Sequence, residues 1–212
     1  MKVILAYGDS LTYGADPAAA DRHVYEDRWP TVLEQGLGGQ ARVIPEGLGG
    51  RTTAFDDFSA AADRNGARIL PTLLATHNPL DAVVIMLGTN DLKPYINGSA
   101  LGAAHGIVRL IEIIRTYPYN RGGSAPAIVV VSPPHVVPTD HPELSPMFEG
   151  GVAESQKLAG HYRRIATDLG VTFFDAATVA TASPLDGVHI DARNTRAIGQ
   201  ALVPVVKQVL GL

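Results

Sequence analysis

The sequence predicts an α/β fold in which a parallel sheet lies between two layers of helices. Short apolar runs rich in Val and Ile alternate with segments of helical periodicity along the 212 residues. The runs show little polar alternation, which is typical of parallel strands covered on both faces. Right-handed connections bring the carboxyl ends of such strands to one edge of the sheet. We therefore expect a three-layer αβα sandwich with a five-stranded parallel sheet in the flavodoxin-like order 2-1-3-4-5.

Each strand is expected where an apolar run is bounded by polar residues, Gly or Pro. In the first of them Val3, Ile4, Leu5 and Ala6 are followed by Gly8, which ends the strand. The same reasoning, in chain order, predicts strands over Lys2–Tyr7, Arg42–Pro45, Ala82–Leu87, Ile128–Ser132 and Val171–Phe174.

Helices are expected between these strands, where apolar residues recur with helical spacing. The last helix has Ala197, Ile198, Ala201, Leu202 and Val205 on one face. In chain order, the expected helices are Trp29–Leu37, Asn65–Thr76, Ala100–Arg115, Val152–Leu169 and Asn194–Leu210. Two long irregular segments remain, Thr52–Arg64 and Pro133–Gly151, and connections of this length commonly form binding loops, lids or contacts.

Composition indicates one globular domain spanning residues 1–212. Hydrophobic residues make up 46% and charged residues 18%, with a formal net charge of −4. The Lys and Arg residues are scattered, so we expect neither a nucleic-acid nor a membrane partner and favour a small neutral substrate. The chain has no Cys, its first apolar run is shorter than a signal peptide requires, and no segment has transmembrane length. We therefore expect a cytoplasmic protein.

The sequence Gly8-Asp9-Ser10-Leu11 follows the first expected strand directly. A polar residue at that place emerges at the carboxyl edge of the sheet, where open α/β folds bind ligands. Ser10 is therefore a candidate nucleophile. A turn or a helix N-cap accounts for the same residue types equally well, and this motif alone does not separate the two interpretations.

Two further clusters follow the second and third expected strands. Gly49 and Gly50 allow a main-chain N–H to approach a ligand, although a tight turn explains two adjacent glycines as well. Gly88-Thr89-Asn90-Asp91 supplies a neutral amide, which suits the stabilisation of an oxyanion, while a helix cap is the structural alternative. No phosphate-binding glycine pattern is present.

A fourth cluster, Asp186-Gly187-Val188-His189, lies between the last strand and the last helix. A spacing of three residues can place a carboxylate beside Nδ1 of the imidazole while Nε2 faces a nucleophile. Any one of the seven histidines is more commonly an ordinary core or surface residue. Metal-ligand spacing is absent from the sequence, and this chemistry requires no metal and no other cofactor.

Taken together in this order, the four clusters resemble the SGNH, or GDSL, hydrolase family. The resemblance implies that Ser10 attacks an ester, that His189 takes its proton and that Asp186 orients the imidazole. It also implies an oxyanion hole made by the N–H groups of Ser10 and Gly50 and the side chain of Asn90.

Longer stretches resemble the bacterial arylesterase and acyltransferase (perhydrolase) branch of this family. They are Glu46-Gly47-Leu48 with Arg51-Thr52-Thr53, Ile85 to Asp91, Val131-Ser132-Pro133-Pro134 and Phe148-Glu149-Gly150-Gly151. The resemblance implies a serine esterase for short-chain and aryl esters, with acyl transfer to alcohols or peroxide. It also implies a homo-oligomer, in some relatives an octamer, built through loops like Pro133–Gly151.

The expected walls of the substrate pocket are Leu11, Tyr13, Ala15, Thr89 and Lys93, together with the loop from Pro133 to Phe148. Some relatives carry a bulky aromatic residue at the position of Ala15, so a wider pocket that favours transfer less is expected here. A solvated surface charge is an equally good interpretation of Lys93. The apolar residues of the long loop are buried either in an interface or against the domain's own core.

Two alternatives to the arylesterase remain. One keeps the fold and the triad but acts on acetylated sugars or lipid thioesters. The other is a binding module without catalysis, which the intact Ser10, Asp186 and His189 disfavour.

Overall fold

A five-stranded parallel sheet in the order β2-β1-β3-β4-β5 forms the centre of the molecule. The structure is a computed structural model that describes residues 1–19, 21–120 and 123–212. The strands are β1 (Lys2–Gly8), β2 (Ala41–Gly47), β3 (Ala82–Met86), β4 (Ala127–Ser132) and β5 (Thr172–Asp175). The predicted fold class and strand order are confirmed, and every strand ends within two residues of its predicted limits.

The register brings the carboxyl ends of the first three strands together. Gly8 at the end of β1 pairs with Gly47 at the end of β2 and with Met86 at the end of β3. β1 and β3 are buried along most of their length because helices cover both faces of the sheet. The polar residues that follow these strands therefore begin side by side at one edge of the sheet.

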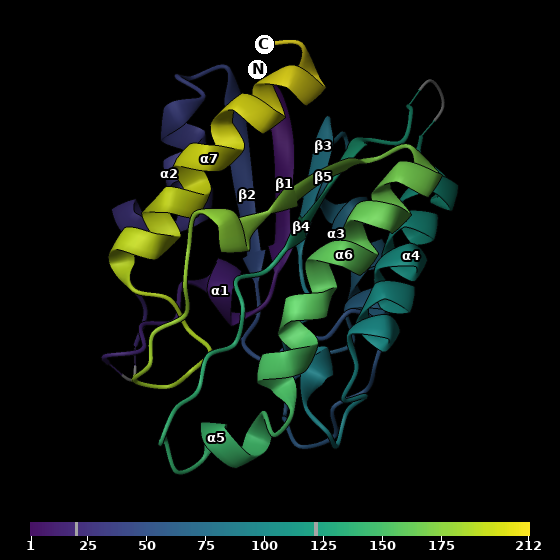
Figure 1. Ribbon diagram of the computed structural model, residues 1–212. Helices are drawn as coiled ribbons and strands as arrows, with labels where there is room; N and C mark the ends of the chain where they lie inside the picture. Colours follow the sequence, from purple (N-terminus) through teal and green to yellow (C-terminus); the bar gives the residue numbers. More distant parts are fainter. Residues whose placement is uncertain (20, 121–122) are drawn as a thin grey trace.

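Helices cover the two faces unequally. α2 (Trp29–Gly36) and α7 (Ala192–Leu210) lie on one face, and α3 (Gly66–His77), α4 (Ala100–Thr116) and α6 (Gly151–Leu169) lie on the other (Figure 1). The predicted helices are confirmed with small shifts at their ends. Within the described ranges, no helix combines the length and the apolar composition needed to cross a bilayer.

Side-chain caps explain where three of these helices begin. The side chains of Asn65, Ser99 and Asp191 accept hydrogen bonds from backbone N–H groups in the first turns of α3, α4 and α7. Each such cap stabilises a helix by about 1 kcal/mol. The sequence had placed the first residue of α3 at Asn65 and that of α7 at Asn194, which are shifts of one and two residues.

The shorter elements had no counterpart in the sequence analysis because each is one turn or less. They are α1 (Ser10–Tyr13), α5 (Leu144–Met147) and the 3-10 turns η1 (Tyr25–Asp27), η2 (Asn90–Leu92) and η3 (Ala176–Thr178). α5 lies within the segment predicted to be irregular, at the same end of the molecule as α1 (Figure 1). Residues 52–64 contain no helix and only one isolated β-bridge, between Thr52 and Asn65.

The long loop from Pro133 to Gly151 packs against the rest of the same chain. Val136 and Phe148 are buried and form a small apolar cluster with Val188, and Leu144 and Met147 pack on its edge. The sequence left burial in an interface or against the domain's own core as the two possibilities for the apolar residues of this loop. Val136 and Phe148 are buried against the domain itself, and Leu144 and Met147 are partly buried there. Their burial therefore requires no second chain.

Candidate active site

Ser10 is the first residue of α1, directly after β1 and the capping residue Asp9. Oδ1 of Asp9 accepts a hydrogen bond of 3.0 Å from the N–H of Leu11, which starts the helix. Gly8 makes this tight strand-to-helix change possible, because a Cβ there would lie 1.9 Å from Oγ1 of Thr12. Both interpretations of the motif therefore apply, with Asp9 as the cap and Ser10 as the candidate nucleophile that lines the pocket.

The side chains of Ser10, His189 and Asp186 form one hydrogen-bonded chain. Oγ of Ser10 lies 3.0 Å from Nε2 of His189, and Nδ1 of His189 lies 2.6 Å from Oδ2 of Asp186. The three residues come from two segments 179 positions apart in the sequence. The nucleophile, base and orienting carboxylate expected from the sequence are thus within hydrogen-bonding distance of one another.

A tight turn fixes Asp186. Its Oδ1 accepts the backbone N–H groups of Val188 and His189, both at 2.9 Å. Burial raises the pKa of Asp186, but the hydrogen bonds from His189 and from these N–H groups outweigh it and lower the pKa below its usual value. Gly187 has a φ of 80°, and a Cβ there would lie 2.7 Å from the carbonyl oxygen of Val137.

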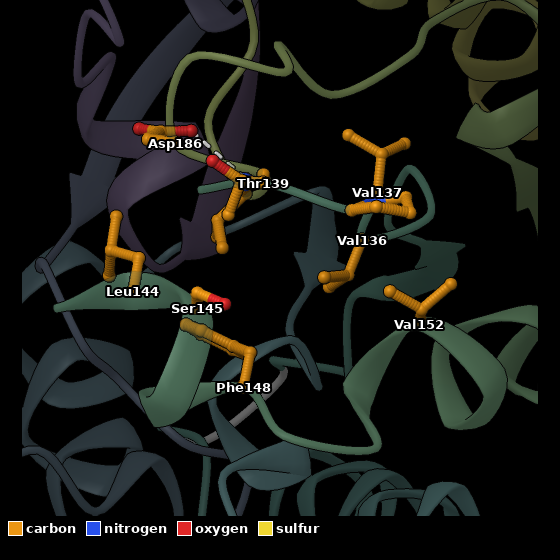
Figure 2. Close-up of a pocket in the computed structure, with 11 residues that line it drawn as sticks. Val136, Val137, Thr139, Leu144, Ser145, Phe148, Val152 and Asp186 are labelled. Carbon is orange, nitrogen blue, oxygen red and sulfur yellow. Dashed lines mark hydrogen bonds between the residues drawn. The ribbon is translucent and has the colours of Figure 1, made fainter. Parts of the chain in front are cut away.

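A small cavity of about 150 Å³ lies beside the Asp186 turn, and most of its walls are apolar. Figure 2 shows Leu144 and Phe148 on one side of it and Val136 and Val152 on another, with Asp186 at its edge. The loop 133–151 supplies most of these walls. The loop therefore helps to bury the carboxyl group of Asp186, which is 5% exposed.

Two backbone donors at the site have no partner. Within the described ranges, the N–H groups of Ser10 and Gly50 donate to no acceptor in the chain. Ser10 lies at the start of a helix, where N–H groups are left free, and Gly50 lines the same pocket as Ser10. Both donors are therefore free to meet an oxyanion, the role that the family resemblance implies for them.

The side-chain amide of Asn90, unlike the N–H groups of Ser10 and Gly50, already has hydrogen-bond partners. Its Nδ2 donates to Oδ2 of Asp9 at 3.2 Å and to the carbonyl oxygen of Arg51 at 3.1 Å. Both amide hydrogens therefore have acceptors already, although both bonds are long. An oxyanion would have to share one of these hydrogens or replace the bond to Arg51.

Three buried ionisable side chains, those of Asp9, Arg51 and Asp91, lie at the sheet edge that carries Ser10, and we call them the floor of the site. Burial raises the pKa of Asp9 to about 6 and that of Asp91 to about 7. Asp91 accepts hydrogen bonds from the N–H and the hydroxyl of Thr53. Nη1 of Arg51 donates to the carbonyl oxygen of Gly8 at 2.8 Å and also to that of Glu46. Arg51 therefore links the carboxyl ends of β1 and β2.

The pocket in front of Ser10 has a volume of about 490 Å³ and contains three of the five predicted wall residues, Tyr13, Ala15 and Lys93. Leu11 and Thr89 do not line it, so those two predictions are wrong. Leu11 points from the single turn of α1 into the core beside Ile4, and Thr89 is buried beneath the surface. The loop 133–148 contributes Leu144, Met147 and Phe148, as expected.

Ser59, Arg64 and Tyr95 also line this pocket and were missed by the sequence analysis. Ser59 and Arg64 belong to the irregular segment 52–64, whose length indicated a binding loop without naming its residues. Tyr95 follows η2 and is 56% exposed, and no local pattern marks it. The described residues contain no group of three or more His, Asp or Glu placed to hold a metal ion.

The whole chain is similar to solved esterase structures. A carbohydrate acetylesterase family member from Sinorhizobium meliloti is 52% identical over 100% of both chains, with a TM-score of 0.99. The aryl esterase of M. smegmatis is 41% identical over 99% of this chain and 100% of its own, with a TM-score of 0.92. A second carbohydrate acetylesterase from Sinorhizobium meliloti is 36% identical over 99% and 100%, with a TM-score of 0.92.

The family comparison agrees with these structures and with the four clusters at the sheet edge. No curated protein is similar enough to add a further comparison. The family model of GDSL-like lipases and acylhydrolases matches residues 6–195, a range that includes Ser10, Asn90 and His189. The chain therefore belongs to the GDSL-like lipase/acylhydrolase family and is a carboxylic ester hydrolase of the SGNH type.

Proposed function

We propose that this esterase cleaves short-chain esters through an acyl intermediate on Ser10. The observation that carries the proposal is the hydrogen-bonded chain from Ser10 through His189 to Asp186. Nε2 of His189 is placed to take the proton of the Ser10 hydroxyl, and the carboxylate of Asp186 holds Nδ1–H. The lowered pKa of Asp186 keeps that carboxylate ionised beside the imidazolium that forms.

In the first half-reaction, Oγ of Ser10 bonds to the ester carbonyl carbon and the carbonyl electrons move to its oxygen. The N–H groups of Ser10 and Gly50 donate to that oxyanion, and Asn90 shares a hydrogen with it. The imidazolium of His189 then protonates the leaving alcohol oxygen as the ester bond breaks. In the second half-reaction, water attacks the acyl carbon as it loses a proton to His189. The bond from the acyl carbon to Oγ then breaks, the imidazolium returns the proton to Oγ of Ser10, and the carboxylic acid is released.

Pre-steady-state kinetics with para-nitrophenyl acetate test this mechanism. We expect a burst of nitrophenol equal to the enzyme concentration if deacylation is slower than acylation, and acetylated Ser10 in the quenched enzyme. Ser10→Ala should lose the burst and the turnover together. Wild-type turnover in Ser10→Ala would overturn the mechanism.

Acetyl groups on aryl alcohols or on sugars are the two substrate classes that we propose. The structures at 52% and 36% identity are named as carbohydrate acetylesterases, and the one at 41% as an aryl esterase. The polar side chains of Ser59, Arg64 and Tyr95 in the pocket favour an oxygen-rich alcohol such as a sugar. Comparing turnover of acetylated xylan, para-nitrophenyl acetate and a long-chain ester would separate these classes from a lipid thioesterase.

Acyl transfer to an alcohol or to peroxide is a further proposal. The small side chain of Ala15 lies in the wall of the pocket, where it leaves room for water near the acyl group. We therefore expect hydrolysis to exceed transfer in dilute alcohol. Product ratios from one aryl ester, with water, an alcohol and peroxide in competition, measure this partition directly, and predominant transfer would contradict the expectation.

A homo-oligomer, with an octamer as one possibility, is proposed from the family resemblance alone. Val136 and Phe148 of the loop 133–151 are buried within one chain, and Leu144 and Met147 are partly buried there, so these residues supply little separate physical support. Sedimentation velocity at micromolar concentration tests the proposal. Only monomers in that experiment would remove it.

A further inference from the structure

Lys93 is a buried cation inside the pocket of Ser10. Its exposed fraction is 5%, and it follows η2, the turn that also carries Asn90. Within the described ranges its ammonium group has neither an ion-pair partner nor a hydrogen-bond acceptor, and Nζ is not among the atoms that are sealed from solvent, so it opens into the pocket. Its one recorded side-chain interaction is with the ring of Phe148, whose centroid lies 5.5 Å from Nζ. The interpretation of Lys93 as a solvated surface charge is therefore wrong.

The side chain of Lys93 is largely buried, and its surroundings only partly offset the cost of taking its charge out of bulk water. Burial lowers the pKa of Lys93, as does the positive charge of Arg64, whereas Asp57, Asp9 and Asp91 raise it. Asp57 already pairs with Arg64 at 2.7 Å, and Asp9 and Asp91 already accept hydrogen bonds from Asn90 and Thr53. The ring of Phe148 attracts the ammonium but offers it no hydrogen-bond acceptor.

The residues that line the pocket include basic side chains and no acidic ones. Lys93 and Arg64 line it, and none of its lining residues is Asp or Glu, although the protein has a formal net charge of −4. Arg64 lies directly above the turn that presents the N–H of Gly50, because a Cβ on Gly50 would lie 2.5 Å from Nε of Arg64. Arg64 is already paired with the buried carboxylate of Asp57, so Lys93 is the lining cation without a partner in the space that an ester must occupy to reach Ser10.

We propose that this pocket selects esters that carry a carboxylate, and that Lys93 binds that carboxylate. The inference rests on the proposed function of the Ser10 site and specifies its substrate class. The carboxylate can belong to the acyl part, as in a half-ester of a dicarboxylic acid, or to the alcohol part, as in an acetylated hydroxy acid. In either case it supplies the acceptor that the Lys93 ammonium lacks within the chain.

Two matched pairs of esters test the inference. The alcohol-side pair is para-acetoxybenzoate and its methyl ester, and the acyl-side pair is the mono-phenyl ester of succinic acid and its methyl ester. For each pair, the ratio of kcat/KM for the anionic ester to that for the neutral one is measured in wild type and in Lys93→Met. Comparing the ratio between proteins cancels the intrinsic reactivity of each ester.

We expect Lys93→Met to lower this ratio about tenfold for one of the two pairs, and that pair identifies the side of the substrate that carries the carboxylate. Lys93→Gln should lower it similarly, and it keeps a polar head if the Met variant folds poorly. Lys157→Met is the matched control, since it removes an exposed lysine of α6 and should leave both ratios unchanged. Added salt should lower the wild-type ratio of the affected pair.

An unchanged ratio for both pairs in folded Lys93→Met and Lys93→Gln would overturn the inference. An equal fall in kcat/KM for anionic and neutral esters would also overturn it, because Lys93 would then act on the oxyanion or on the fold. These outcomes differ from failure of the proposed function. In that case Ser10→Ala would retain turnover of the neutral esters, whatever the effect of Lys93.

Discussion

The turn of Asp186 and the floor beneath Ser10 both bury carboxyl groups but shift their pKa values in opposite directions. Asp186 is 5% exposed, and Asp9 and Asp91 are both 0% exposed. The pKa of Asp186 is lowered, whereas the pKa of Asp9 is raised to about 6 and that of Asp91 to about 7. Burial raises the pKa of all three groups, so the net shift of each depends on how far hydrogen bonds and charges offset it.

For Asp186 the hydrogen bonds outweigh the effect of burial, whereas for Asp9 and Asp91 the effect of complete burial is larger than that of their hydrogen bonds. The carboxylate of Asp186 accepts two backbone N–H groups and the imidazole of His189. Asp91 accepts from Thr53 but is buried completely, and the negative charge of Asp9 raises its pKa further. The Asp186 turn is thus built to hold a charge beside the base, while the floor orders the loops that carry Ser10 and Asn90.

The largest effect is expected for Asp186→Asn. An amide keeps the size of the side chain but presents the wrong hydrogen-bonding group to Nδ1, which favours the tautomer of His189 that cannot accept the proton of Ser10. We expect kcat to fall about 10⁴-fold at neutral pH with little change in the fold. Steady-state kinetics and circular dichroism check this. A loss of kcat of less than about tenfold would show that a group other than the carboxylate of Asp186 orients His189.

Asn90→Ala should come next. The variant removes one donor to the oxyanion and also leaves Asp9 without one of its partners. We expect acylation to slow about a hundredfold or more, measured as the burst rate with para-nitrophenyl acetate. An unchanged burst rate would show that the bonds to Asp9 and Arg51 keep the amide away from the oxyanion.

Asp9→Asn should have a smaller effect. Oδ1 and Oδ2 of Asp9 accept from Leu11 and Asn90 respectively, and an amide offers only one acceptor oxygen for these two donors. We expect kcat to fall about tenfold through misplacement of Asn90, with KM nearly unchanged. Combining this change with Asn90→Ala provides the control, because the double variant should then be no slower than Asn90→Ala alone.

Asp91→Asn should alter stability more than activity. The folded-state pKa of about 7 lies above the ordinary value of 3.8, so the native state binds more protons than the unfolded state between these values. The titration of Asp91 therefore lowers the free energy of unfolding as pH rises through that range. Asp91→Asn has no titrating group at this position, so its free energy of unfolding lacks this pH dependence.

Urea unfolding at about pH 4.5 and about pH 7.5 tests the prediction. We expect the stability of Asp91→Asn relative to wild type to increase with pH. Asp140→Asn, which removes an exposed carboxylate of the loop 133–151, controls for the loss of one surface charge. Parallel curves for Asp91→Asn and wild type would contradict a raised pKa for Asp91.

The elements and the triad could be predicted from sequence because their signals are local. Runs of Val and Ile mark the strands, and the clusters at Ser10, Asn90 and Asp186 follow strands or precede a helix. The direction of a side chain on a single turn is not local, which is why Leu11 was placed in the pocket and lies in the core. Arg64 lies near Gly50 because the segment 52–64, which contains no helix, folds back toward that turn, and no local pattern predicts this path.

The charges of the site could not be predicted either. Nothing in the sequence around Lys93 distinguishes a surface lysine from a buried one, since its surroundings include Phe148 and Arg64 from other segments. The same holds for Asp9 and Asp91, whose raised pKa values follow from complete burial in the assembled fold.

Covalent labelling with an organophosphonate tests the central claim that Ser10 is the nucleophile activated by His189. Peptide mass spectrometry of the labelled wild type should show one adduct on Ser10, and labelling should be abolished in Ser10→Ala and strongly slowed in His189→Ala. An adduct on another residue, or His189→Ala labelled as fast as wild type, would contradict the account.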